Sequence, residues 1–122
     1  MNQISPTCNR PMQEEADLLK GLSDPIRLRL VVLLANNGEV CVCHLVTALD
    51  EPQYKISRHL GVLRAAGWVH ARRDGAWMHY RLAEGDNLLQ RTLQNCLRDS
   101  FRHHPEALRD QARLNTTCCE AP

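Results

Sequence analysis

The chain has 122 residues, with 15 basic and 14 acidic side chains and a formal net charge of +1 at pH 7. This length fits one domain with one hydrophobic core and argues against a multidomain machine. No stretch approaches the roughly 18 apolar residues of a membrane span, and no basic-then-apolar secretory signal opens the chain, so we expect a cytoplasmic protein with no membrane partner.

Charge is distributed unevenly along the chain. Residues 1–52 have a balance of −3, residues 53–81 one of +5, and residues 82–122 one of −1. A basic segment between two acidic ones is the electrostatic pattern of a phosphate-binding face. On charge alone an ordinary solvated surface explains the segment better, so the interpretation depends on the motifs.

The first predicted elements are two helices. Residues 12–21 have helical apolar periodicity and end at a glycine. The sequence Ser23-Asp24-Pro25 then provides a capping side chain followed by proline in the first turn of a second helix. That helix is nearly all apolar over residues 26–35 and ends at Asn36-Asn37-Gly38, which tolerate left-handed backbone. This apolar composition predicts that the second helix is the buried centre of the domain.

Two more helices are predicted close together, with the spacing of a helix-turn-helix. The first spans about residues 41–49; Asp50-Glu51-Pro52 then repeats the cap-then-proline signal and opens the second. In this second helix Ile56, Leu60 and Leu63 form one inward stripe. The stripe is flanked by Gln53 and His59, and the outward face holds groups that bond base edges and phosphates: Tyr54, Lys55, Ser57 and Arg58.

A β-hairpin is predicted next, because residues 68–73 and 77–82 favour strands and flank Asp74-Gly75-Ala76. A helix-turn-helix followed by a hairpin is a winged helix. The predicted fold class is therefore mainly α (α+β), with about five helices and a β-hairpin wing. Arg72 and Arg73, beside the hairpin tip, are placed to reach a DNA backbone or minor groove.

The rest of the chain is predicted to be a helix and a tail. Residues 87–103 form an amphipathic helix, which packs either on its own core or on a partner chain. The polar segment from residue 105 is interpreted as a short helix or loop followed by a tail. The expected organisation is an N-terminal arm (1–11), a DNA-binding and dimerisation domain (12–104) and a C-terminal tail (105–122) that carries the vicinal Cys118 and Cys119.

The segment Gly38-Glu39-Val40-Cys41-Val42-Cys43-His44-Leu45, followed by Lys55-Ile56-Ser57-Arg58-His59-Leu60, resembles the ArsR/SmtB family of winged-helix metalloregulators, most closely its proteobacterial arsenical-responsive repressors. The likeness runs from about Asp17 to Leu82. It implies a homodimeric repressor, without an organic cofactor, that binds double-stranded operator DNA and leaves it when a thiophilic ion binds. It also places the helix that begins at Pro52 in the major groove, with contacts from Gln53, Tyr54, Lys55, Ser57, Arg58 and His59.

Cys41 and Cys43 fall at the family's inducer-binding pair, which implies As(III) or Sb(III) as the inducer. Thiolate is a soft ligand and suits such ions. Positions i and i+2 of a regular helix lie about 200° apart, so their sulfurs face different sides. We therefore expect that one ion held by both sulfurs unwinds the start of this helix and moves the adjoining recognition helix.

The third ligand of a trivalent metalloid is left open by the sequence. Some arsenical repressors have a third cysteine where this chain has Val46. Cys8 of the arm and the tail pair Cys118 and Cys119 are equal candidates to complete the site. Cys96, on the terminal helix, is a weaker candidate whose expected role is packing in a dimer interface.

Two other functions of the same fold remain open. Cadmium or lead sensing through Cys8, Cys41 and Cys43 is one, although only one cysteine is present in the arm where two are expected. A thiol redox switch through the vicinal Cys118 and Cys119 is the other. An enzyme is a much weaker interpretation, because a thiol oxidoreductase requires Cys-x-x-Cys near a βαβ unit and this chain has Cys-x-Cys in a helical context.

Overall fold

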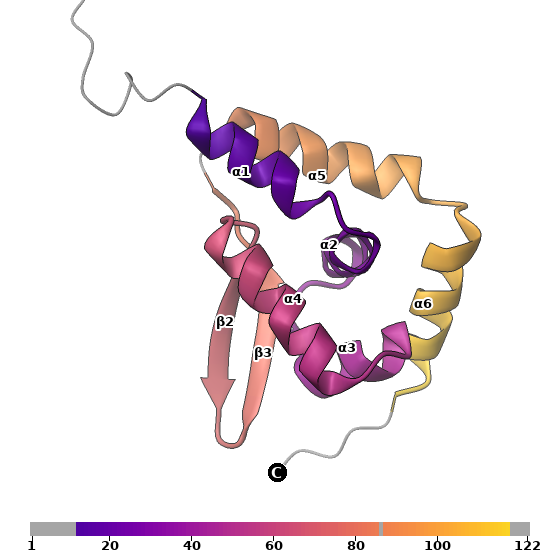
Figure 1. Ribbon diagram of the computed structural model, residues 1–122. Helices are drawn as coiled ribbons and strands as arrows, with labels where there is room; N and C mark the ends of the chain where they lie inside the picture. The colour runs from indigo at the N-terminus through magenta and orange to yellow at the C-terminus, as the bar shows by residue number, and fades with distance from the viewer. Residues whose placement is uncertain (1–11, 86, 118–122) are drawn as a thin grey trace, which may run out of the picture.

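The computed structural model describes residues 12–85 and 87–117 and contains helices grouped around α2, with an antiparallel sheet whose β2–β3 hairpin projects to one side (Figure 1). The helices are α1 (Gln13–Gly21), α2 (Pro25–Asn37), α3 (Val42–Leu49), α4 (Gln53–Ala65), α5 (Leu88–Ser100) and α6 (Pro105–Asn115). The strands are β1 (Val40–Cys41), β2 (Val69–Asp74) and β3 (Trp77–Leu82), in the order β1-β3-β2. The predicted helix-turn-helix and wing are both present.

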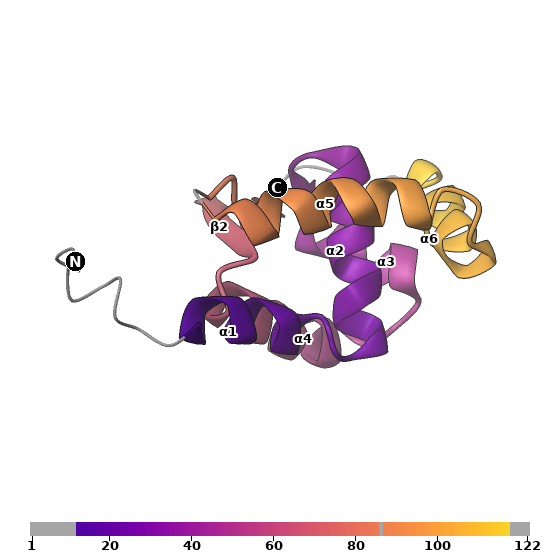
Figure 2. The same ribbon diagram turned by 90° about the horizontal axis from the view of Figure 1, so that it is seen from above.

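The buried centre is α2, as predicted. Its residues 30–34 are at most 5% exposed. A helix that is apolar on every side needs neighbours on every side, and α2 contacts α3, α4, α5, α6 and β3 (Figure 2). Asp24 caps its start by accepting hydrogen bonds from the backbone N–H groups of Ile26 (2.9 Å) and Arg27 (3.2 Å). Gly38, at φ +71°, ends it.

The helix-turn-helix consists of α3 and α4. Ile56, Leu60 and Leu63 of α4 form the predicted inward stripe, and each is fully buried. The prediction that Asp50 caps α4 is wrong. Asp50 ends α3 in the left-handed conformation (φ +56°), which Asp tolerates better than most residues, and α4 begins after Pro52 without a side-chain cap.

The wing is the predicted hairpin, with β2 and β3 paired from Val69 and Leu82 to Asp74 and Trp77 across a two-residue turn. Gly75 has φ +63° in this turn, which only glycine adopts at no steric cost. A third strand, β1, was not predicted: Val40 pairs with Tyr80 and Cys41 with His79 of β3. The pairing of β1 attaches the beginning of the helix-turn-helix to the wing.

The C-terminal part forms two helices. Asn87 caps α5 by accepting from the backbone N–H of Gln90 (3.1 Å). The segment from residue 105, expected as a short helix or loop, forms α6, which packs on α2 and α3. The packed body therefore continues beyond residue 104, whereas the expected arm (1–11) and the vicinal cysteines lie outside the described residues. None of the helices within the described ranges is long and apolar enough to cross a membrane.

The cap of α2 is expected to contribute measurably to stability. Replacing Asp24 with Ala leaves two backbone N–H groups without an acceptor and should lower the free energy of unfolding by about 1 kcal/mol. Asp24→Asn keeps an acceptor at the same place and is the matched control. Urea unfolding at pH 7, followed by circular dichroism, measures both variants. An Ala variant as stable as the wild type would contradict the capping role.

Candidate functional site

The outer face of α4 carries polar side chains predicted to contact nucleic acid. Four of them are exposed: Gln53, Tyr54, Ser57 and Arg58. Lys55 is partly covered and forms an ion pair with Glu51, one helical turn earlier (3.2 Å). The side chain of Arg58 makes no hydrogen bond or ion pair with any part of the described chain. This face therefore presents a guanidinium, a phenol, an amide and a hydroxyl to any groove it enters.

His59 does not belong to this face, contrary to the expectation of a DNA contact. Its side chain is buried, with Nδ1 3.2 Å from Nη1 of Arg27 and Nε2 3.8 Å from the carboxylate of Asp24. Burial lowers the pKa of His59, and the neighbouring cations Arg27, Arg58 and Lys55 lower it further, although Asp24 opposes them. The neutral imidazole therefore connects α4 to the capped start of α2.

The two predicted wing arginines, both exposed on β2, differ in their partners. Arg72 donates from Nε (3.0 Å) and Nη2 (2.7 Å) to the carboxylate of Glu39, which lies directly before β1. The paired guanidinium lowers the pKa of Glu39. The side chain of Arg73 makes no hydrogen bond or ion pair among the described residues. In the wing, the guanidinium of Arg73 is therefore available to a ligand. The guanidinium of Arg72 is bound to a carboxylate, which occupies the position that a phosphate could take.

Cys41 and Cys43 lie where the wing meets the helix-turn-helix. Cys41 is the buried second residue of β1 and also the N-cap of α3, whereas Cys43 is the second residue of α3. The extended backbone of Cys41 (φ −68°, ψ 143°) brings the two Sγ atoms to 3.1 Å. The expectation that one ion must unwind the helix is therefore wrong, because Cys41 is not in the helix.

The sulfur separation is close to what one ion requires. Two bonds of about 2.3 Å at a tetrahedral angle hold two sulfurs about 3.8 Å apart. The pair is 3.1 Å apart, so an ion bound by both would move the two sulfurs apart by about 0.7 Å. Once Cys43 is reduced, this spacing fits two ligands of one thiophilic ion.

A pocket of about 370 Å³ opens beside Cys41, between β1, α3, β3 and the end of α6. Its walls are formed by Asn37, Glu39, Val40, Cys41, His44, His79, Leu114, Asn115 and Thr117. The Nε2 atom of His44 is buried there and has no hydrogen-bond partner among the described residues. Within residues 12–85 and 87–117 there is no cluster of three or more metal-binding side chains.

The other predicted cysteines are placed as follows. Thr117, the last residue described before the C-terminus, lines the pocket, and Cys118 and Cys119 follow it in the sequence. These two and Cys8 lie outside the described residues. Cys96 is exposed on α5, with Sγ 3.5 Å from Oγ of Ser100, and does not line the pocket.

The chain is similar to known regulatory proteins. Residues 24–71 match the model of the family described as bacterial regulatory protein, arsR family. The chain is 54% identical over 66 residues to the arsenical resistance operon repressor of Escherichia coli K12, a match that covers 54% of this chain and 56% of that repressor. The transcriptional repressor BigR from Xylella fastidiosa is 40% identical, with a TM-score of 0.61 over 72% of this chain and 86% of BigR. The chain belongs to the ArsR family.

A second solved structure extends the likeness to nearly the whole of a relative. The homodimeric winged helix-turn-helix domain Mb0332 from Mycobacterium bovis, described as a possible ArsR-family transcriptional regulator, is 30% identical with a TM-score of 0.64. The match covers 86% of this chain and 97% of that domain. The family and the winged-helix fold predicted from the sequence are thus confirmed, and ArsR proteins are regulators rather than enzymes.

Sequence reasoning missed the groups that surround the predicted residues. Glu39 accepts the hydrogen bonds of Arg72 and lies next to the predicted Cys-Val-Cys segment. No local sequence pattern predicts that these two residues form a pair. The buried imidazole of His59 contacts Asp24 and Arg27, which lie more than 30 positions earlier in the sequence. Only the capping pattern at Asp24 was visible beforehand, and it predicts the helix start rather than the contact with α4.

His59 is expected to make this ArsR-family protein less stable in mild acid. Its pKa is lowered in the folded chain relative to about 6.5 in the unfolded chain. The unfolded state therefore binds the proton first, so stability is complete above about pH 6.5 and falls as the pH decreases through this value toward the folded pKa.

Urea unfolding of the wild type and of His59→Gln between pH 7.5 and 5.5 measures this effect. We expect the wild type to lose stability across this range and the variant to lose less. His70→Gln, at an exposed position on β2, is the matched control and should follow the wild type. Equal slopes for the wild type and His59→Gln would contradict the role of the buried imidazole.

Proposed function

We propose that this protein is a transcriptional repressor that binds operator DNA as a homodimer and is released when As(III) or Sb(III) binds its cysteine thiolates. The observation that carries the proposal is the 3.1 Å contact of Cys41 and Cys43 at the residue that joins the wing to α3. The likeness to the arsenical resistance operon repressor of Escherichia coli supports it.

In the proposed complex, α4 enters the major groove and the wing lies over the backbone. The α4 contacts come from Gln53, Tyr54, Lys55, Ser57 and Arg58, whereas His59 positions the helix from behind. Arg73 is available to a phosphate at once, and Arg72 after it leaves Glu39. Phosphate contacts of this kind fix the register of the protein, and contacts to base edges provide its specificity.

The homodimer is supported by the exposed apolar side chains of α1 and α5. Leu19 and Leu88 are 51% and 69% exposed in the single chain, and α1 and α5 are in contact with each other. The Mb0332 domain of Mycobacterium bovis is itself homodimeric. A symmetric dimer would present two α4 helices about one turn of DNA apart, roughly 34 Å.

The third thiolate is assigned to Cys118 or Cys119 rather than to Cys8. The helix α6 brings the chain as far as Thr117, which lines the pocket of Cys41, and the two cysteines are the next residues in the sequence. Three soft thiolates complete the coordination that a trivalent metalloid prefers.

Binding of the ion affects both DNA-binding elements through one residue. Cys41 pairs with His79 of the wing and caps α3, so a change in the separation of the two sulfurs displaces both. The free energy available for release is the difference in ion affinity between DNA-free and DNA-bound protein. A 100-fold loss of DNA affinity requires a difference of about 2.7 kcal/mol.

Arg58 is expected to contact phosphate or a base edge. Arg58→Ala should weaken binding to a promoter fragment about tenfold and reduce the salt dependence of log K by about one unit, because one fewer counterion is released. Arg109→Ala, at an exposed site on α6, is the control and should leave both quantities unchanged. Fluorescence anisotropy between 50 and about 200 mM salt measures them. An unchanged affinity and slope for Arg58→Ala would remove α4 from the proposed interface.

The cysteine substitutions test the inducer site. Cys41→Ser and Cys43→Ser should keep DNA affinity and abolish release by arsenite, because each removes one of the paired ligands. A Cys118→Ser/Cys119→Ser double variant should require at least about tenfold more arsenite for release. Cys8→Ser and Cys96→Ser should behave like the wild type. Anisotropy of the labelled promoter, in protein kept reduced by a phosphine that does not chelate arsenite as dithiols do, measures release.

The same titration separates the alternatives. Release of the Cys41→Ser variant by arsenite would contradict the thiol site. Release by cadmium or lead but not by arsenite or antimonite, with loss of the response in Cys8→Ser, would identify the other metal sensor. Release by peroxide in the absence of any ion would identify a redox switch.

A further inference from the structure

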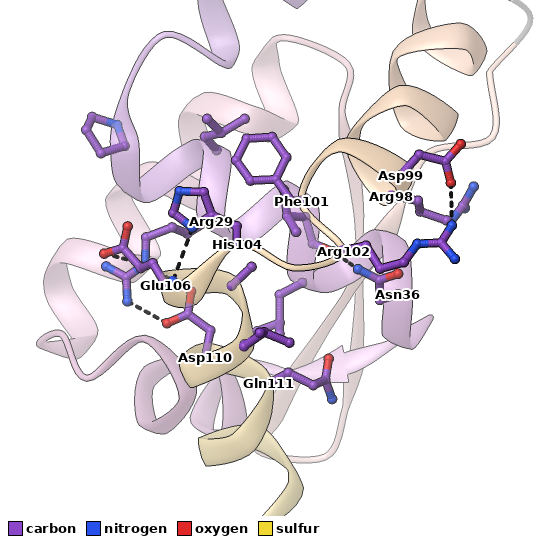
Figure 3. Close-up of a pocket in the computed structure, with 16 residues that line it drawn as sticks. Arg29, Asn36, Arg98, Asp99, Phe101, Arg102, His104, Glu106, Asp110 and Gln111 are labelled. Atoms are coloured by element: carbon purple, nitrogen blue, oxygen red, sulfur yellow. Dashed lines mark hydrogen bonds and ion pairs between the residues drawn. The ribbon is translucent and has the colours of Figure 1, made fainter.

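The helix α6 is fixed to the domain by a buried ionic network. Asp110, 1% exposed, accepts hydrogen bonds from Nε (3.0 Å) and Nη2 (2.8 Å) of Arg29 in α2 and from Nη2 of Arg113 (3.0 Å). Figure 3 shows Arg29, Glu106 and Asp110 together beside a cavity of about 530 Å³. A buried carboxylate needs such partners because an unpaired buried charge is strongly destabilising.

Both arginines also reach the end of α3. Nη2 of Arg29 donates to the carbonyl of Leu49 (2.9 Å), and Nε of Arg113 donates to the carbonyl of Ala48 (2.7 Å). Carbonyls in the last turn of a helix have no partner inside the helix, and positive charge is favourable there. Asp110 thus holds, through two guanidiniums, the last two residues of α3 before the turn to α4.

The C-terminal end of α6 reaches the thiol pocket. Leu114, Asn115 and Thr117 line this pocket together with Cys41. The side-chain amides of Gln111 and Asn37 bond reciprocally (2.7 and 3.0 Å) and fix α6 to the end of α2. One helix of 11 residues therefore contacts the domain at the thiol pocket and at the turn of the helix-turn-helix.

We propose that α6 is a strap that connects the thiol pocket to the turn between α3 and α4, and that Asp110 and Arg113 are positioning residues for DNA binding. The inference rests on the proposed function. An ion bound at Cys41 changes the pocket that the end of α6 lines. A shift of α6 then moves the guanidinium of Arg113 and the carbonyl of Ala48 that it holds, and this alters the position of α4.

Arg113→Met tests the strap. The variant keeps the aliphatic packing and leaves Asp110 paired with Arg29, so the buried charge retains a partner. We expect DNA affinity to fall about tenfold and the ratio of DNA affinities without and with saturating arsenite to fall to less than about a third of the wild-type ratio. Arsenite affinity for the free protein should not change. Arg113→Lys keeps the charge and should restore part of the ratio.

Arg109→Met provides the matched control, because it makes the same substitution at an exposed position on α6 outside the Asp110 network and outside the thiol pocket. It should keep the wild-type DNA affinity and ratio. If Arg113→Met has the wild-type ratio, or if Arg109→Met changes it as much, the positioning role is overturned. If Arg113→Met does not fold, Arg113→Lys decides: a reduced ratio supports the strap and a wild-type ratio overturns it.

The same measurements distinguish failure of the proposed function from failure of the strap. Wild-type protein that does not bind the promoter, or is not released by arsenite, overturns the proposed function and the strap with it. Wild-type protein that is released normally, together with an Arg113→Met variant released to the same extent, overturns the strap alone.

Discussion

The burial of α2 is the constraint on which the rest of the structure depends. Five consecutive residues, 30–34, are buried, so no side of this part of the helix can face solvent. The helix-turn-helix, the wing strand β3 and the two C-terminal helices supply the neighbours. The charged residues of α2 lie near its start, where Arg27 contacts His59 of α4 and Arg29 contacts the end of α3. The same helix therefore provides the core and the polar contacts that position both helices of the DNA-binding motif.

The features predicted correctly are those with a local cause. A cap followed by proline begins α2, a two-residue turn with Gly75 connects the wing strands, and the stripe of Ile56, Leu60 and Leu63 is buried. Each of these features depends on residues within a few positions of one another. Side-chain periodicity or the residues of the turn therefore predict it from the sequence alone.

The errors have a common physical reason, which is that the deciding partner lies far away in the sequence. Two residues of β1 are too few to show strand alternation, so Cys41 was placed in a helix although β3 holds it in extended backbone. His59 lies on the flank of the apolar stripe, and only its contact with Arg27 shows that it points inward. The sequence predicts a short helix or loop for the α6 segment but places it outside the domain (12–104), because the partners of Asp110 include Arg29, 81 positions earlier.

The central claim is that the ion and the operator compete for two states of the same ArsR-family protein. Cys41 belongs at once to the sheet of the wing and to the start of α3, so the ion is expected to prefer the DNA-free form. Linkage makes this preference reciprocal. Calorimetric titration of the reduced protein with arsenite, alone and saturated with operator DNA, measures it directly. The account predicts that DNA weakens arsenite binding by the same factor as arsenite weakens DNA binding; equal arsenite affinities in the two titrations would contradict it.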